Sequence, residues 1–410
     1  MASAARRRIA APAAAAPLPA LPDEILESIF LLLDDPADLA RAASACTCFR
    51  RVATARPFLR RFGSLHGPPP LLGLLFGGPD GFRAADPPHR SAKAARALAR
   101  AADFTFSFLP NHQQGGGGGG GGWAVRDARD GRVLLSRPVS AAAAFDDLMV
   151  CDPLHRRCVR VPSVPNELVA SIPLRDRNFV TPFLAPAAAA EDDNEPPAFS
   201  VIRTCQLGNN KVVAFFFGSG SGSWHAATPY MSLSTLPTGC IGFQRYYARG
   251  CFHWMISSTS SLVLDTREMK FSTISLPPID GLPHRAIFER GEGRLGLIAF
   301  GDGGWPFRRI CEIWQQNSGV VVTQDWQLYK TIPLPGYSDG MDIQGEDDSY
   351  LLLRPIQASD YIELLRPRQY FVLDLKTLLF EGIFSIDVGY RARFGHLYVS
   401  FPPPLAPPSI

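Results

Sequence analysis

The chain has 410 residues, of which 46% are hydrophobic and 19% are charged, and its formal net charge is +3 at pH 7. This length allows two domains and this composition allows a sizeable core. The sequence has no long basic stripe with interleaved aromatic residues, so we predict no nucleic-acid partner. Its longest strongly apolar run near the start, 29–33, is far shorter than the ~20 residues of a membrane span, so no membrane association is expected.

The first segment, residues 1–19, is predicted to be a disordered tail. Three arginines followed by an Ala/Pro run loosely imitate a signal or transit peptide. Pro12, Pro17 and Pro19 interrupt any apolar helix there, which favours a solvated tail instead. A run of three arginines is weak evidence for a nuclear address, so we expect a cytoplasmic or nuclear location, or both.

Residues 20–63 carry the pattern of three short helices. Apolar residues recur at helical spacing after Pro22 and also fill the other faces of the first helix, so we expect that helix to be buried nearly all round. Asp35 is placed to cap a second helix that begins at Pro36. A unit of about 40 residues rarely buries enough surface alone, so its excess apolar surface calls for a partner.

This pattern resembles the F-box, the docking module of cullin-based ubiquitin ligases. The matching residues are Leu21, Pro22, Glu24, Ile25, Leu26, Ile29, Leu33, Asp38, Leu39, Cys46, Phe49 and Arg50. Two residues depart from the family pattern: Phe49 stands where many members have Trp, and Cys48 where Lys is common. The alternative is a plain amphipathic helical hairpin packed in a larger core.

The resemblance implies a Skp-type adaptor as partner and, through it, a cullin. It also implies which residues bind the adaptor: Leu21, Pro22, Ile25, Leu26, Ile29, Leu33, Leu39, Cys46, Phe49 and Val52.

Residues 64–103 are predicted to be a linker. Gly67-Pro68-Pro69-Pro70 forms a semi-rigid spacer, and the short apolar run 71–76 is either a strand or a packed connector. Ser91 could cap a short helix over 92–102. We therefore expect the following β domain to fold without the helical module, from a start near residue 92.

From residue 104 to residue 402 a recurring phrase predicts β-hairpins. An apolar strand ends in an aspartate, a turn follows and a second strand returns; the aspartates are Asp152, Asp265 and Asp374. An aspartate side chain accepts hydrogen bonds from the backbone of its own turn, which explains its place in the phrase. Residues 326–335 carry a partial fourth copy. Between the hairpins, 115–122, 187–197 and 218–222 read as flexible loops, and 403–410 as a Pro-rich tail.

Small antiparallel sheets repeated along a chain favour a β-propeller. Blades of about 50 residues give about six blades, with seven possible, and a β-sandwich is the alternative. The chain is therefore expected to be an α+β multidomain protein. Its β part loosely resembles the kelch-like, F-box-associated propellers of plant F-box proteins. The segments 104–108 and 396–401 are the two terminal strand candidates, and we predict that they close one blade.

No catalytic signature appears in the sequence: there is no Gly-x-Ser-x-Gly, His-Glu-x-x-His or Walker loop. His253 is interpreted as an ordinary strand residue, the acidic group 346–348 as a solvated turn, and Trp305 as a loop residue. The cysteines show no Cys-x-x-Cys or zinc spacing, so we expect reduced thiols, no metal and no cofactor. The eight cysteines are Cys46, Cys48, Cys151, Cys158, Cys205, Cys240, Cys251 and Cys311.

Together these features predict a non-catalytic, substrate-recognition subunit of a Skp–cullin–F-box ubiquitin ligase. The helical module would bind the adaptor and the β domain an unknown target protein. Two alternatives remain open: an F-box protein that acts as a scaffold or competitor without directing degradation, and a propeller enzyme or sugar-binding protein.

Overall fold

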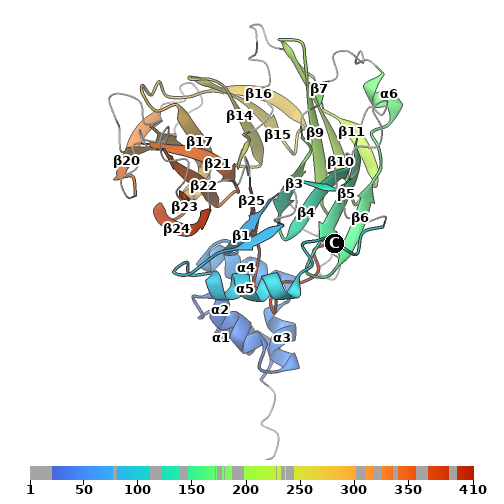
Figure 1. Cartoon of the computed structure of the whole chain (residues 1–410), viewed down its shortest axis with the longest axis vertical. Coiled ribbons are helices and arrows are strands. Elements are labelled where there is room, and N and C mark those ends of the chain that lie inside the picture. Colours follow the sequence, from blue (N-terminus) through green and yellow to red (C-terminus); the bar gives the residue numbers. More distant parts are fainter. Residues whose placement is uncertain are drawn as a thin grey trace, which may run out of the picture.

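The computed structural model describes residues 21–76, 81–110, 122–137, 146–170, 172, 178–179, 181–186, 198–227, 229–231, 236, 244–301, 310–316, 326–335, 340–356, 368–386 and 395–410. A small helical region lies at one end of the molecule and a larger β body at the other (Figure 1). The predictions for the tail 1–19, most of the glycine run, the loop 187–197 and Trp305 lie outside the described residues.

The helical region contains four helices where the sequence predicted three. They are α1 (Asp23–Phe30), α2 (Pro36–Ala43), α3 (Thr47–Ala53) and α4 (Arg56–His66). Asp35 caps α2 as predicted, since its Oδ1 accepts a hydrogen bond from the backbone N of Ala37 at 2.8 Å. The fourth helix continues to His66, beyond the predicted boundary at residue 63.

These helices share one core of buried apolar residues. Phe30 lies at its centre, with its ring edge-on to Phe49 at 5.3 Å and to Phe58 at 6.3 Å between centroids. On the surface, Asp23 of α1 pairs with Arg51 of α3, and Glu27 pairs with Arg61 of α4 at 2.7 Å. Both ion pairs are exposed, so packing of the aromatic core contributes more stability than they do.

The β body consists of six sheets, which is the six-bladed propeller predicted from the sequence. Four sheets are formed by four consecutive antiparallel strands each. Their strands are β3 (Ala124–Arg129), β4 (Arg132–Arg137), β5 (Asp147–Asp152) and β6 (Arg157–Val161); β13 (Tyr246–Ala248), β14 (Cys251–Ser257), β15 (Ser260–Asp265) and β16 (Lys270–Ser275); β17 (His284–Arg290), β18 (Arg294–Phe300), β19 (Ile310–Gln316) and β20 (Trp326–Pro333); and β21 (Gly340–Glu346), β22 (Tyr350–Ile356), β23 (Arg368–Asp374) and β24 (Leu379–Ile386).

A fifth, larger sheet follows β6 and the short helix α6 (Asn166–Val169). Its long central pair is β9 (Ser200–Leu207) and β10 (Lys211–Gly218), joined in register from Leu207 opposite Lys211 to Ser200 opposite Gly218. The shorter strands are β7 (Asn178–Phe179), β8 (Phe183–Ala185), β11 (Ser223–Ala226) and β12 (Tyr230–Met231).

The predicted aspartate turns are confirmed at all three positions. Oδ1 of Asp265 accepts hydrogen bonds from the backbone N of the residues two and three positions later, at 2.8 and 2.9 Å. Oδ1 of Asp374 does the same at 2.9 Å for both bonds. Oδ1 of Asp152 accepts from the backbone N of His155 at 3.0 Å. Each aspartate thus fixes the turn between the third and fourth strands of its sheet.

The sixth sheet closes the propeller, but not with the predicted strand. It has the order β2 (Phe82–Ala84), β1 (Leu71–Leu75), β25 (His396–Val399), and β25 is paired with β1. The segment 104–108 forms no strand; Phe104 instead packs edge-on against Tyr398 at 5.2 Å. The last predicted strand, β25, therefore does close the propeller. Its partner, β1, comes from the segment that was expected to be a linker.

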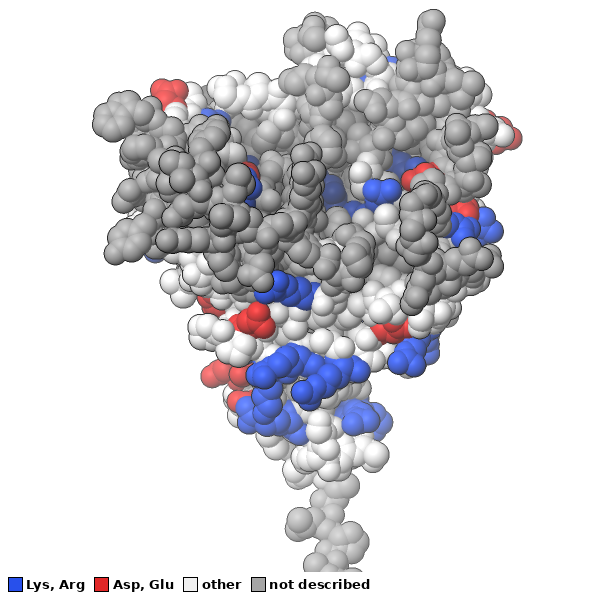
Figure 2. Space-filling model, viewed as in Figure 1, with Lys and Arg blue, Asp and Glu red and all other residues white. Residues whose placement is uncertain are grey.

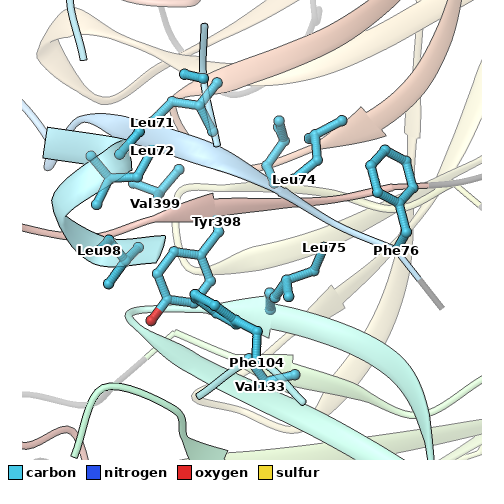
Figure 3. Close-up of a cluster of buried hydrophobic side chains, with 14 of the residues drawn as sticks. Leu71, Leu72, Leu74, Leu75, Phe76, Leu98, Phe104, Val133, Tyr398 and Val399 are labelled. Atoms are coloured by element: carbon cyan, nitrogen blue, oxygen red, sulfur yellow. The ribbon is translucent and has the colours of Figure 1, made fainter. Parts of the chain in front are cut away.

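The linker prediction for 64–103 is corrected accordingly. All five residues of β1 are buried, and Leu71, Leu74 and Leu75 pack with Tyr398 and Val133 in one core (Figure 3). The expected helix is present as α5 (Ala92–Ala101), which turns Ala95 and Leu98 into the same core, although Ser91 makes no capping bond. Residues 64–103 thus belong to the propeller body because their apolar side chains fill it.

The predicted Pro-rich tail, 403–410, is likewise part of the packed structure. Leu405 is 0% exposed and belongs to the core of the helical region. The backbone N of Ser409 donates a hydrogen bond to Asp152 in the propeller at 2.8 Å.

Candidate partner-binding site

An apolar stripe on α1 and its two flanking segments points away from the helical core. Leu21, Ile25, Ile29 and Leu32 follow one another at helical spacing and are 48%, 47%, 44% and 79% exposed. The opposite side of the same segment carries Leu26 and Phe30, which are buried. The helix was expected to be buried nearly all round; instead it divides its apolar residues between a core face and an exposed face.

The ten residues predicted to bind an adaptor divide into three groups. Leu21, Pro22, Ile25, Ile29 and Cys46 are exposed, and Leu33 and Phe49 are half-buried. Leu26, Leu39 and Val52 are buried in the helical core, so their side chains cannot contact a partner in this fold. For these three residues the structure corrects the prediction, because they are needed to hold the helices together.

Cys46 has a local structural role that the sequence did not reveal. It precedes α3, and its Sγ accepts a hydrogen bond from the backbone N of Phe49 at 3.4 Å. The thiol therefore serves as the N-cap of the helix that carries Phe49.

Two exposed leucines of the helical region are missing from the predicted set. Leu32 is the most exposed of the large apolar residues in the stripe, and Leu65 at the end of α4 is 61% exposed. The helical spacing of Leu32 was visible in the sequence, whereas nothing in the sequence indicated which way Leu65 would point.

Part of the surface of the helical region and of α5 is basic. Figure 2 shows Lys and Arg side chains gathered over the helical region and α5. On α5 the exposed basic residues are Lys93, Arg96 and Arg100. A partner with acidic groups beside an apolar contact would suit this surface.

A second group of charged residues lines the inner strands of the propeller. β25 contacts β3 and β21, and β3 contacts β8. One strand from each of four neighbouring sheets therefore lies beside the next. Asp127 of β3 forms an ion pair with Arg245 at 2.7 Å and lies 3.9 Å from His396 of β25. Its Oδ2 also accepts a hydrogen bond from the backbone N of Leu184 on β8, at 2.7 Å. One carboxylate thus connects three sheets and the segment just before β13.

The acidic group 346–348 belongs to this interior network rather than to a freely solvated turn. Asp348 pairs with the buried Arg129 at 2.6 Å. Burial raises the pKa of Glu346 to about 7, against the opposing effect of Arg245. Burial also raises the pKa of Asp347 to about 7, and the negative charge of Asp348 acts in the same direction. The predicted turn is present between β21 and β22, but its three acidic residues are half-buried rather than freely solvated.

Two histidines are held neutral by burial. Burial lowers the pKa of His396 to about 4, although the nearby Asp127 opposes this shift. His253 on β14 lies opposite Tyr246, is 2% exposed, and has its pKa lowered to about 4 by burial. Its packed position agrees with its interpretation as an ordinary strand residue.

A cavity of about 430 Å³ lies between the spacer and the turns of two neighbouring sheets. Its wall includes Pro68 of the spacer together with Arg290, Lys376, Glu289 and Asp348. Because two basic and two acidic side chains line it, its charge favours no single class of ligand.

The part of the chain that the structure describes has neither a cluster of metal ligands nor a membrane-spanning helix. There, no group of three or more His, Cys, Asp or Glu residues is arranged to hold a metal ion. Among the same residues, no helix has the length and apolar character needed to span a membrane.

Comparison with protein families identifies the helical region. Residues 18–62 match the F-box-like family. The chain therefore has an F-box-like domain near its start, followed by an all-β propeller of six blades. No curated protein matches the chain.

Solved structures resemble parts of the chain at low identity. The dihydro-heme d1 dehydrogenase NirN is 13% identical over 65% of this chain and 54% of its own, with a TM-score of 0.29. Dipeptidyl peptidase 4 of Porphyromonas gingivalis is 9% identical over 64% and 36%, with a TM-score of 0.28. The fission yeast SREBP–SCAP binding domains are 10% identical over 62% and 62%, with a TM-score of 0.30. The alignment spans less than two thirds of each of these structures, and the TM-scores are too low to support any conclusion about this chain.

Proposed function

We propose that this protein is the substrate-recognition subunit of a Skp–cullin–F-box ubiquitin ligase. Its F-box-like domain would bind a Skp-type adaptor and, through it, a cullin, while the propeller would hold a target protein. The chain itself would be non-catalytic. Its contribution would be proximity, because a bound target has a high effective concentration near the ubiquitin-carrying subunit. Such a complex would act in the cytoplasm, the nucleus or both.

The observation that carries the proposal is the apolar stripe on α1. Its residues are not used by the core of the F-box-like domain: Ile25 and Ile29 lie one turn apart on α1, and Leu21 and Leu32 flank the helix. Fully burying a Leu or Ile side chain is worth roughly 1.5–3 kcal/mol. Leu21, Ile25 and Ile29 are already about half-buried, so each would contribute on the order of 1 kcal/mol, and the more exposed Leu32 somewhat more. A protein surface that covered the stripe would therefore gain useful affinity.

The basic surface of the helical region and α5 supports an electrostatic contribution to partner binding. Arg50 on α3 and the three basic residues of α5 are exposed near the helical region. Charges of this kind raise association rates and help to select an acidic partner. We therefore expect binding of the adaptor to weaken as salt concentration rises.

The test is capture of adaptor and cullin by the full-length protein from cells. The variant Ile25→Asp/Ile29→Asp places two charges on the stripe without touching the helical core. The matched control is Leu379→Asp, which changes an equally apolar residue on the propeller that is 61% exposed. We expect wild type and the control to capture both partners and the stripe variant to lose them. Equal capture by all three would show that the stripe is not the docking surface.

A second measurement separates the ligase from a non-degradative scaffold. Proteins captured by the propeller are compared with and without proteasome inhibition, and their ubiquitination is measured. The ligase proposal expects a captured target that is ubiquitinated only when the stripe is intact. A captured target that is never ubiquitinated would favour the scaffold.

A further inference from the structure

After β25 the chain leaves the propeller and returns to the F-box-like domain. We call residues 401–410 the strap. The backbone N of Leu405 and of Ala406 both bond to the carbonyl of Pro402, at 2.8 and 3.1 Å, so the strap makes a defined turn. Phe401 packs against the core of the F-box-like domain and Leu405 is enclosed within it.

One end of the strap is fixed to the F-box-like domain. Leu405 shares its core with Phe58 and Phe62 of α4, and all three are buried. At the start of α4, Nη2 of Arg56 donates a hydrogen bond to the carbonyl of Pro408 at 2.6 Å. An apolar anchor and a charge-assisted hydrogen bond thus hold the strap to one helix.

The other end of the strap is fixed to the propeller. The backbone N and Oγ of Ser409 both donate to Oδ2 of Asp152, at 2.8 and 2.9 Å. Nε of the buried Arg132 donates to the carbonyl of Ser409 at 2.9 Å, and Nη1 of Arg157 donates to the carbonyl of Ile410 at 3.1 Å. Asp152 therefore has two roles: it fixes its own hairpin turn and it accepts the strap.

The spacer is a second connection between the two domains. The spacer enters β1, and β1 is the strand that pairs with β25. The backbone N of Ser400 bonds to the carbonyl of Pro70 at 3.3 Å, so the entering and leaving chains lie side by side. The strap adds a separate attachment on the neighbouring sheet of β3 to β6. Two attachments at different sheets restrain the orientation of one domain relative to the other more than one attachment does.

We propose that the strap fixes the orientation of the F-box-like domain relative to the propeller. In a ubiquitin ligase, and thus resting on the function proposed above, this would hold a bound target at a set position relative to the adaptor. Transfer to a target lysine depends on such positioning, since a misplaced reactant loses the benefit of proximity. The strap would then act as a positioning device.

The test uses the full-length protein with changes at the propeller end of the strap. Asp152→Ala removes the acceptor, and Ser409→Glu places a carboxylate against that of Asp152. Neither change touches the apolar anchor in the F-box-like domain. The matched control is Asp265→Ala, which removes the equivalent hairpin aspartate of another sheet, where Oδ1 likewise caps the turn. This control reports on loss of a turn bond alone.

Two quantities are measured: the hydrogen-exchange rates of residues 401–410, and the maximum dimension of the protein by small-angle X-ray scattering. We expect at least tenfold faster exchange in the strap and a larger maximum dimension for Asp152→Ala and Ser409→Glu, with Asp265→Ala like wild type. The proposal is overturned if the two strap variants match wild type in both measurements, or if Asp265→Ala changes as much as they do. Adaptor capture is measured in parallel, and we expect all variants to retain it. If the wild type captures no adaptor, the proposed ligase function is wrong. The exchange and scattering measurements would still test whether the strap fixes the orientation of the two domains.

Discussion

Leu75 of β1 lies opposite His396 of β25, so two strands far apart in the sequence form the sheet that closes the propeller. Without this pairing β25 would leave an open sheet edge beside β3 and β21, its two neighbours. The segment before α5 is therefore as much a part of the propeller as the hairpins that follow it.

Removal of β1 should prevent cooperative folding of the propeller. A chain that starts at residue 92, as the sequence suggested, lacks both β1 and β2, whereas a chain that starts at Gly67 retains them. We expect the shorter chain to aggregate or to melt broadly and the longer one to melt in one transition. Thermal unfolding followed by circular dichroism distinguishes them; an equally sharp transition in the shorter chain would contradict the closure by β1.

Gly296 on β18 should not tolerate a side chain. A Cβ there would lie 2.3 Å from the ring of Phe288, which is 1% exposed and has no room to move. We expect Gly296→Ala to reduce the free energy of unfolding by about 1–3 kcal/mol, the usual cost of overpacking. Gly291→Ala is the control, because nothing lies within 4 Å of its Cβ. Denaturant unfolding measures both, and equal stability of the two variants would refute the packing argument.

Glu346 should make the stability of the protein depend on pH. Its pKa is raised from 4.5 to about 7 in the folded state, so the folded protein binds more protons than the unfolded chain between these values. Stability associated with this group is therefore present below pH 4.5 and lost as the pH rises to about 7. We compare the free energy of unfolding of Glu346→Gln with that of wild type at each pH. We expect this difference to favour the variant more at pH 8 than at pH 5.

Chemical denaturation at both pH values tests this expectation. The neighbouring Asp347 and His396 are present in both proteins, so their own titrations largely cancel in the comparison. Glu268→Gln, at an exposed position on the turn after β15, serves as the control. A difference between Glu346→Gln and wild type that is the same at pH 5 and pH 8 would argue against a buried, neutralised carboxyl group.

Local features of the fold could be predicted from the sequence, whereas long-range ones could not. The turns at Asp152, Asp265 and Asp374 depend on bonds to residues two or three positions away, so the sequence alone indicated them. The run 71–75 was ambiguous between strand and connector, because its partner β25 is distant and short apolar runs have no clear period.

The sequence indicated that the first helix carries a partner-binding surface, but not which of its apolar residues form that surface. A helix that is apolar on most faces does not reveal which residues its own domain will bury, so Leu26 could not be separated from Ile25 and Ile29. The strap was missed for a similar reason. Its prolines are typical of a solvated tail, and a single leucine, Leu405, gave no sign that it would enter the core of another domain.

Under the proposed function, the F-box-like domain docks a Skp-type adaptor through the exposed side of α1. The most direct measurement is the affinity of the purified full-length protein for a purified adaptor, by titration calorimetry. We expect wild type to bind and Leu21→Ala/Pro22→Ala to bind more weakly by a few kcal/mol at most, with about tenfold in affinity for each 1.4 kcal/mol. Circular dichroism should show equal helicity in both proteins, since neither side chain lies in the helical core. A double mutant that binds as well as wild type would place the contact elsewhere on the helices, and a wild type that binds no Skp-type adaptor would contradict the ligase function itself.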